Sequence, residues 1–335
     1  MSSRRGFLAA AGGTMLAAPL LGACAAHDHS EHSPAVDPSG GHGPMSGVHG
    51  ATFRTGGRVD HAANGFDPRI LLRDFDYGHT SIGADGRRVR EWEVIAQDRE
   101  IEVAPGVRFQ AWTFNGRIPG PMLRCTEGDL LRVRFINLSE HQHTMHFHGI
   151  HSAEMDGVPM VGRGIISPGE EFTYTFECTP DSVGVWPYHD HGPNHVVNIA
   201  RGMFGSLIVR EKGAKAPDVE EVLVLHQLPP QVTGVPRVLQ CINGRAFAGN
   251  TPTIRAKVGQ DVAIHVIGGD SMFHTFHVHG HRWQVGHRNE DCPTVGPNEV
   301  ITARWNEDNP GRWLYHCHVF THQDAGMAGW LLVNP

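Results

Sequence analysis

Histidine is the residue type whose number and spacing point most directly to chemistry. The chain of 335 residues has 25 histidines against 28 lysines and arginines. Several stand in His-x-His pairs, and residues i and i+2 of a β-strand point to the same face. Each pair could therefore present two imidazoles to one metal site. The pairs beyond residue 140 include His146/His148, His189/His191, His277/His279 and His316/His318.

A cysteine lies between the two histidines of the last pair. On a strand, the Cys317 side chain points away from those of His316 and His318, so its thiolate can bind one metal while they bind another. A thiolate, two imidazoles and a weak thioether form the ligand set of a blue copper site, which transfers single electrons. The sequence offers His274, Cys317, His322 and Met327 for this set.

The pairs occupy equivalent places in two copies of one sequence module. Residues 121–128 recur as 252–259, and the block His146-Phe147-His148-Gly149 recurs as His277-Val278-His279-Gly280 at the same offset. Two further blocks, beginning at residues 189 and 202, recur in the same order beginning at 316 and 326. We therefore expect two domains, at residues 63–213 and 214–335, joined near the polar segment 212–217.

The spacing of apolar residues predicts β-strands in both modules. Apolar and other residues alternate in the segments 131–135, 172–176 and 262–266, and residues 222–225 form a continuous apolar run. The 41 glycines and 22 prolines suit a chain with many turns. We predict an all-β protein made of two β-sandwiches in tandem.

The motifs HFHG, HDH, HTFHVHG and HCHVFTHQDAGM resemble the four copper motifs of the multicopper oxidases. Their order is similar to that of the small two-domain bacterial laccases, and the resemblance covers about residues 85–335. It implies two tandem cupredoxin-like Greek-key domains and four coppers per chain: one type 1, one type 2 and two type 3. By position, His274, Cys317, His322 and Met327 would hold type 1 copper. His146 and His277 would hold type 2, and His148, His189, His191, His279, His316 and His318 would hold the type 3 pair.

The same resemblance implies a function and an assembly. A laccase-like oxidase couples one-electron oxidations of a small reducing substrate (a phenol, an aromatic amine or a metal ion) to reduction of O₂ to water. The resemblance also implies a homotrimer, with each three-copper cluster between the first domain of one chain and the second domain of its neighbour. A Cu(I)-detoxifying metallo-oxidase and a non-catalytic copper-binding protein are the alternatives. Copper nitrite reductase would carry its cysteine ligand in the first domain, where this chain has Asp190.

Asp156 occupies the place of an acidic residue near the cluster in this family. It is a candidate proton donor for O–O cleavage, and the alternative is a turn aspartate before glycine. Gln323 stands where some relatives have glutamate, which puts a proton path through that carboxylate in doubt. Ser152 stands where some relatives have tyrosine, so a tyrosyl electron reservoir is not expected here. The other histidines near the motifs are expected to be solvated or to support ligands: His141, His151, His281 and His287.

The repeat also predicts an altered copy of the blue site in the first domain. Mapping the four ligands back gives His143, Asp190, His195 and Met203, with a carboxylate in place of the thiolate. Two imidazoles and a carboxylate suit Cu(II) or Zn(II) better than blue copper. The site is therefore either an empty relic or the site of a colourless metal.

The first 26 residues resemble an export signal. Residues 3–8 (SRRGFL) are typical of a twin-arginine signal and precede a weakly charged apolar stretch. Residues 21–24 resemble a lipoprotein box that would place a lipid anchor on Cys24, with cleavage at an A-x-A site as the alternative. We expect an exported protein, periplasmic or at the cell surface. Residues 27–62, rich in His, Gly, Ser and Pro, would form a flexible linker or a copper-gathering arm.

Charge and cysteine content add two further expectations. The net charge of −7 argues against nucleic acid as a partner. In an exported protein, Cys125 and Cys178 of the first module, and Cys241 and Cys292 of the second, can form disulfides. We favour bonds within each module, and free buried thiols are the alternative.

Overall fold

The computed structural model describes residues 58–68 and 76–335. The expected export signal, including Cys24, and most of the expected linker lie outside this part. Near the end of that linker, Val59 is buried and its N–H donates to Asn250 Oδ1 at 2.9 Å. The described residues contain no helix that is both long and apolar enough to span a membrane.

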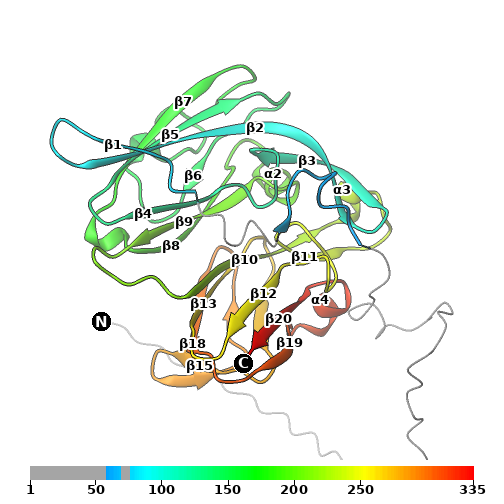
Figure 1. Ribbon diagram of the computed structural model, residues 1–335. Helices are drawn as coiled ribbons and strands as arrows, with labels where there is room; N and C mark the ends of the chain where they lie inside the picture. The colour runs from blue at the N-terminus through cyan, green and yellow to red at the C-terminus, as the bar shows by residue number, and fades with distance from the viewer. Residues whose placement is uncertain (1–57, 69–75) are drawn as a thin grey trace, which may run out of the picture. The chain divides into compact units, whose positions relative to one another are not determined.

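The first domain is a sandwich of two β-sheets (Figure 1). One sheet has the order β1-β2-β5-β7 with β3 also paired to β2, and the other has the order β4-β9-β8-β6. The β2/β5 and β4/β9 pairs are parallel, and the others are antiparallel. The strands are β1 (His79–Ile82), β2 (Arg88–Ala104), β3 (Val107–Phe114), β4 (Met122–Thr126), β5 (Leu130–Asn137), β6 (His146–Phe147), β7 (Glu171–Glu177), β8 (Gly184–His189) and β9 (Phe204–Arg210).

The second domain repeats this plan. Its sheets have the orders β11-β10-β13-β18 and β12-β20-β19-β14-β17, and β15 and β16 form a separate hairpin. The pairs β10/β13 and β12/β20 are parallel, like their counterparts in the first domain. The strands are β10 (Val219–Leu228), β11 (Leu239–Ile242), β12 (Thr253–Lys257), β13 (Asp261–Gly268), β14 (His274–Val278), β15 (Trp283–Val285), β16 (Arg288–Glu290), β17 (Thr294–Val295), β18 (Val300–Asn306), β19 (Gly311–Cys317) and β20 (Ala328–Asn334).

The shared topology confirms the prediction of two all-β sandwiches built from one repeated module. The expected link at 212–217 lies between β9 and β10. Helices are short and follow strands: α2 (His195–Ala200), α3 (Pro230–Thr233) and α4 (Phe320–Asp324), with 3-10 turns at Ala153–Met155 and Pro180–Ser182. Of these, α2 follows β8 and α4 follows β19, so both lie directly after a histidine-bearing strand.

Alternating side chains form a core inside each sandwich. On β5, Leu131, Val133 and Phe135 are fully buried while the residues between them are at least partly exposed, as the sequence pattern predicts. The apolar run of β10 is buried on both faces, because it also packs against the first domain. This third core includes Ile101, Phe204, Val222 and Leu239, so it draws on both sandwiches.

Candidate metal centres

Three ligand atoms converge where β19 ends in the second domain. Cys317 Sγ lies 3.9 Å from His274 Nδ1 and 3.7 Å from His322 Nδ1, and the two nitrogens are 3.3 Å apart. The centre of a triangle with these sides is about 2.1 Å from each atom, which is a metal–ligand bond length. The three buried side chains therefore fit a metal ion as they stand.

Neighbouring groups prepare these atoms for metal binding. His274 Nε2 donates to Asp270 Oδ1 at 3.1 Å, which leaves Nδ1 facing Cys317. Burial alone would raise the pKa of the Cys317 thiol, but hydrogen bonds with His274, His322 and two backbone N–H groups together outweigh burial and lower the pKa to about 6. The thiolate, which is the form that binds metal, is therefore accessible at neutral pH. Met327 is fully buried, and its carbonyl oxygen accepts from the Cys317 N–H at 3.1 Å.

A group of four histidines lies beside this site, on β14 and β19 and on the residues directly after them. His277 pairs with His316 across the two strands, and their rings are 5.4 Å apart. His279 Nε2 lies 3.1 Å from His316 Nε2, and the His318 ring lies 5.4 Å from that of His277. Since Cys317 separates His316 from His318, the chain passes directly from the first metal-binding group to this one.

Strands β6 and β8 place an equivalent group in the first domain. His148 Nε2 lies 3.0 Å from His189 Nε2, and the His146 ring lies 5.4 Å from that of His189 and 5.5 Å from that of His191. These four histidines line one side of a cavity of about 370 Å³. Burial lowers the pKa of His148 to about 4 and that of His189 to about 3. Both imidazoles are therefore neutral at pH 7, as metal ligation requires.

A glycine follows each of the pairs on β6 and β14. Gly149 and Gly280 adopt φ angles of 70° and 72°, in the left-handed region that other residues rarely enter. A Cβ atom would lie 2.5 Å from the Trp186 ring at the first glycine and 2.8 Å from the Trp313 ring at the second. Only glycine fits both the backbone turn and the close tryptophan, which explains the repeated sequence His-x-His-Gly.

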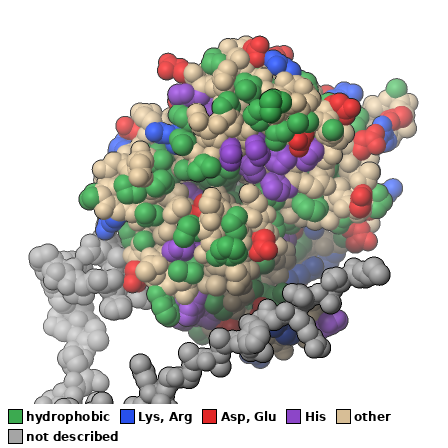
Figure 2. Space-filling model, turned by 180° about the vertical axis from the view of Figure 1, so that it is seen from behind, with side chains coloured by type: hydrophobic (Ala, Val, Ile, Leu, Met, Phe, Trp, Pro, Cys, Tyr) green, Lys and Arg blue, Asp and Glu red, His purple; other side chains and the backbone are tan. Residues whose placement is uncertain are grey.

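Each domain thus presents four histidines, and in the part of the chain that the structure describes the two groups stay separate. Among the described residues, no candidate metal-binding group combines histidines of both domains. His279 and His318 are exposed at the surface, and His146, His148 and His191 are partly exposed. Figure 2 shows a cluster of histidine side chains near the middle of one face, with other histidines lying apart from it. Each four-histidine group is therefore open to a partner.

The structure places Asp156 beside the first-domain group. Asp156 Oδ1 lies 2.7 Å from His151 Nε2 and 3.3 Å from His146 Nδ1, and the Asp156 carbonyl accepts from His146 Nδ1 at 2.6 Å. His151, which the sequence marks only as a nearby histidine, is thus the partner of this carboxylate. Asp270 was not expected from the sequence at all, because nothing in its local pattern distinguishes it from a turn aspartate.

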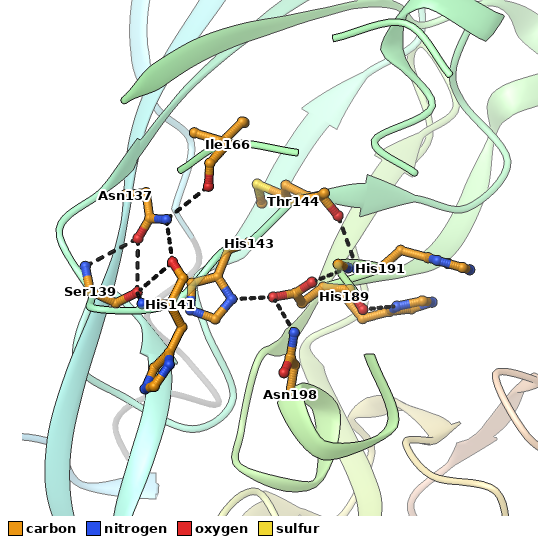
Figure 3. Close-up of polar contacts among 12 residues, drawn as sticks. Asn137, Ser139, His141, His143, Thr144, Ile166, His189, His191 and Asn198 are labelled. Carbon is orange, nitrogen blue, oxygen red and sulfur yellow. Dashed lines mark hydrogen bonds and ion pairs between the residues drawn. The ribbon is translucent and has the colours of Figure 1, made fainter. Parts of the chain in front are cut away.

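The altered site of the first domain is built differently from the expectation. The expected His143 and Asp190 do meet: Nδ1 of His143 is hydrogen-bonded to the Asp190 carboxylate, and Asn198 Nδ2 donates to the same oxygen at 3.1 Å (Figure 3). His195 is exposed, and its ring stacks on that of His191 at 4.8 Å. Assigning His195 to this site was therefore wrong.

Backbone hydrogen bonds show that Asn198 takes the place of His322. The Met327 N–H donates to the His322 carbonyl at 3.1 Å, and the Met203 N–H donates to the Asn198 carbonyl at the same distance. The extra residues of the first-domain loop therefore precede this position rather than follow it. Matching histidine with histidine in the sequence misplaced the insertion.

All five described cysteines are free thiols. Cys125 and Cys178 lie in the core of the first domain with their Sγ atoms 3.3 Å apart. Cys241 is fully buried between the two domains, and Cys292 is partly exposed. A disulfide within the first domain therefore stays a prediction with geometric support.

The chain belongs to the multicopper oxidases, which are copper-dependent oxidoreductases. Two sequence models described as multicopper oxidase match residues 96–214 and 216–335. A solved structure described as a multicopper oxidase is 35% identical, with a TM-score of 0.74 over 80% of this chain and 97% of that one. The blue copper oxidase of Nitrosomonas europaea is 30% identical, with a TM-score of 0.65 over 73% of this chain and 86% of that one.

Curated relatives are much longer proteins. A probable nitrite reductase-hydroxylamine oxidoreductase fusion protein of Kuenenia stuttgartiensis is 29% identical over 277 residues, which cover 75% of this chain and 32% of the relative. The chain therefore spans about a third of that relative's length. It spans 24% of mouse ceruloplasmin, to which it is 28% identical over 261 residues.

Proposed function

We propose that this protein is a laccase-type oxidase that takes single electrons from a small reducing substrate and delivers them to O₂. The observation that carries the proposal is the position of Cys317. Its sulfur belongs to one metal-binding group, while the adjacent His316 and His318 belong to the other. An electron that enters at the sulfur can therefore reach the histidine group through the bonds of a single residue.

The donor sets fit copper in two different roles. Copper bound by His274, Cys317 and His322 would supply a one-electron redox centre, and copper bound by the histidine groups would supply a site for O₂ reduction. Asp270 holds the His274 ring so that Nδ1 faces the sulfur. Asp156 would donate a proton as oxygen is reduced, and its distance of 3.3 Å from His146 supports this role.

We propose further that the cluster is completed between chains of a homotrimer. Each chain presents two open groups of four histidines, and a closed ring of three head-to-tail contacts can bring the first group of one chain against the second group of the next. Exposed apolar side chains beside both groups support this interface. Phe320 is 69% exposed with its ring 5.2 Å from that of His318, and Val196 on α2 is 61% exposed. Each chain would then account for four coppers, three of them in a shared cluster.

Export to the periplasm or cell surface is part of the same proposal. It is supported by the twin-arginine signature at residues 3–8, a route that carries folded proteins, and by the lipoprotein-like box that ends at Cys24. A protein that folds around its metal ions before export requires a route of this kind, which carries folded proteins.

Copper content, spectra and oxygen uptake of the purified protein test the function together. We expect four coppers per chain, a blue absorption band, type 1 and type 2 EPR signals, and O₂ consumption with a phenol or an aromatic amine. Uptake of O₂ with Cu(I) alone would favour a metallo-oxidase. Nitrite consumption in the absence of O₂ would favour a nitrite reductase, and full copper loading without turnover of any substrate would contradict the oxidase.

A further inference from the structure

The carboxylate of Asp190 is enclosed by three N–H donors inside the first domain. His143 Nδ1 and Asn198 Nδ2 both donate to Oδ2, and the backbone N–H of Gly192 donates to Oδ1. His143 and Asp190 are completely buried, and Asn198 is 2% exposed. Figure 3 shows the carboxylate between the His143 ring and the Asn198 amide. A buried carboxylate with this many donors is strongly held in place.

The surrounding backbone is the same as that of the Cys317 site. Asp190 N–H donates to the Met203 carbonyl at 3.0 Å, where Cys317 N–H donates to the Met327 carbonyl at 3.1 Å. The residue after each of them is fixed in the same way by a threonine: His191 N–H donates to Thr144 Oγ1 at 3.0 Å, and His318 N–H donates to Thr275 Oγ1 at 2.9 Å. The two sites therefore share one frame and differ in the side chains inside it.

In the first domain, His143 and Asn198 point N–H groups into the site, whereas a metal ligand must point a lone pair at the metal. A carboxylate can only accept, so His143 must carry its proton on Nδ1, the atom that in His274 faces the thiolate. In the second domain the Asp270 carboxylate accepts a hydrogen bond from His274 Nε2, which keeps the proton on that nitrogen. The equivalent residue in the first domain is Ser139, whose hydroxyl bonds to Asn137 and to the His141 carbonyl instead. His143 Nε2 accordingly has no partner among the described residues.

This arrangement acts directly on a histidine of the candidate cluster. The backbone carbonyl of Asp190 accepts from His189 Nδ1 at 2.9 Å, and this bond turns Nε2 of His189 toward His148 Nε2 at 3.0 Å. The carbonyl of Cys317 does the same for His316 at 2.9 Å. The position of residue 190 thus sets the direction of His189.

We propose that Asp190 is a positioning residue that replaces a metal. Its hydrogen bonds to His143, Asn198 and Gly192 fix the end of β8 as a bound metal would fix the end of β19. They keep His189 and His191 directed toward the cluster without a second metal in the first domain. The inference rests on the proposed copper cluster.

Two substitutions of His143 separate the hydrogen bond from the ring. His143→Asn removes the imidazole but keeps an amide N–H near the place of Nδ1, whereas His143→Ala removes both. Asp190→Ala removes the acceptor itself. Asp129→Asn is the matched control, because Asp129 is also buried in the first sandwich and binds Arg90, away from the histidine group. For each protein, copper per chain, the blue band, the type 2 EPR signal and the melting temperature are measured.

We expect Asp190→Ala and His143→Ala to bind cluster copper about tenfold more weakly, while the blue band per chain is unchanged. His143→Asn should retain most of the cluster copper, and Asp129→Asn should lose stability but not copper. If Asp190→Ala and Asp129→Asn held the same amount of cluster copper, the inference would be wrong while the proposed function would stand. Equal losses in His143→Asn and His143→Ala would also overturn it, because the ring itself would then be required. A wild-type protein without cluster copper would overturn the proposed function instead, and the inference with it.

A measurement on the histidine proton checks that the site is metal-free. We expect a slowly exchanging His143 N–H resonance in both the copper-free protein and the fully reduced protein, whose Cu(I) is diamagnetic and does not broaden it, and we expect it to be lost in Asp190→Ala. Disappearance of this resonance in the fully reduced wild type would show that a metal displaces the proton, and would overturn the inference.

Discussion

The carbonyl oxygen of Cys317 accepts a hydrogen bond from Nδ1 of His316 at 2.9 Å. The residue that supplies the sulfur of one candidate metal-binding group therefore also orients a histidine of the other. Because the acceptor is a backbone oxygen, it is retained when the side chain at position 317 becomes serine, whose hydroxyl can still hydrogen-bond to His274 and His322 and hold the end of β19. The two centres can be separated by mutation for this reason.

Changing Cys317 to serine tests that separation. The variant loses the sulfur but keeps the carbonyl that orients His316, so we expect it to lose about one copper per chain and all blue colour while keeping the cluster EPR signal. Oxygen uptake should stop, since the electron entry point is gone. A variant that stayed blue, or that still reduced O₂ at the wild-type rate, would contradict the assignment of Cys317.

A charge at the exposed apolar residue beside the second histidine group tests the proposed trimer. Phe320→Asp should reduce the mass in solution about threefold and remove cluster copper, while the blue site, which lies within one chain, remains. Light scattering and EPR measure the two effects. The control is Ile82→Asp, which changes an equally exposed side chain on the edge strand β1. Loss of mass with full retention of cluster copper would show that one chain builds the cluster alone.

Substitution of Asp156 tests proton delivery. Asp156→Asn keeps a polar side chain beside His151 and His146 but removes the proton donor, so we expect reoxidation of the reduced protein by O₂ to slow by about 100-fold. Reduction of the blue site by substrate should be unchanged. Stopped-flow absorbance follows both half-reactions, and an unaltered reoxidation rate would leave Asp156 as a turn residue only.

His226 predicts how stability depends on pH. Burial lowers its pKa to about 4, and its Nε2 accepts from the Gly244 N–H at 3.0 Å. The unfolded chain takes up this proton below about pH 6.5, so the stabilisation is complete above that pH and is lost as the pH falls toward 4. At pH 5 the loss is on the order of 2 kcal/mol.

The matched variant for this prediction is His226→Gln, whose side-chain oxygen can accept the same hydrogen bond but cannot titrate. Urea unfolding of the copper-free protein at pH 7.5 and pH 5 should show a smaller pH effect in the variant than in the wild type. The same pH dependence in both proteins would assign the acid sensitivity to other groups.

Cys125 and Cys178 are predicted to form a disulfide in the exported protein. Their Sγ atoms are 3.3 Å apart in a buried core, so little movement is needed once an oxidant of the export compartment removes the two hydrogens. Mass spectrometry should find the intact protein about 2 Da lighter than the reduced form, and reduction should lower the free energy of unfolding by about 2–4 kcal/mol. Thiol labelling of Cys125 in the unreduced, unfolded protein would contradict the bond.

Much of the fold and of the ligand set follows from local patterns. Alternation of apolar residues located β5 and β7, and the repeated His-x-His-Gly block identified two equivalent histidine pairs, after which the structure places the turns at Gly149 and Gly280. The loop after β8 was misjudged, because sequence similarity favoured His195 over Asn198. Only the hydrogen bond from Met203 to Asn198 shows where the extra residues lie.

The sequence by itself determined which side chains share a face, because alternation along a strand is a property of the backbone and needs no distant contact. It therefore separated Cys317 from His316 and His318. Tertiary structure decided what the loops bring to those strands: Asp270 against His274, Asn198 against Asp190, and two histidine groups that remain separate within the described residues. These depend on packing between segments far apart or on loop length, and neither is encoded in a strand's own pattern.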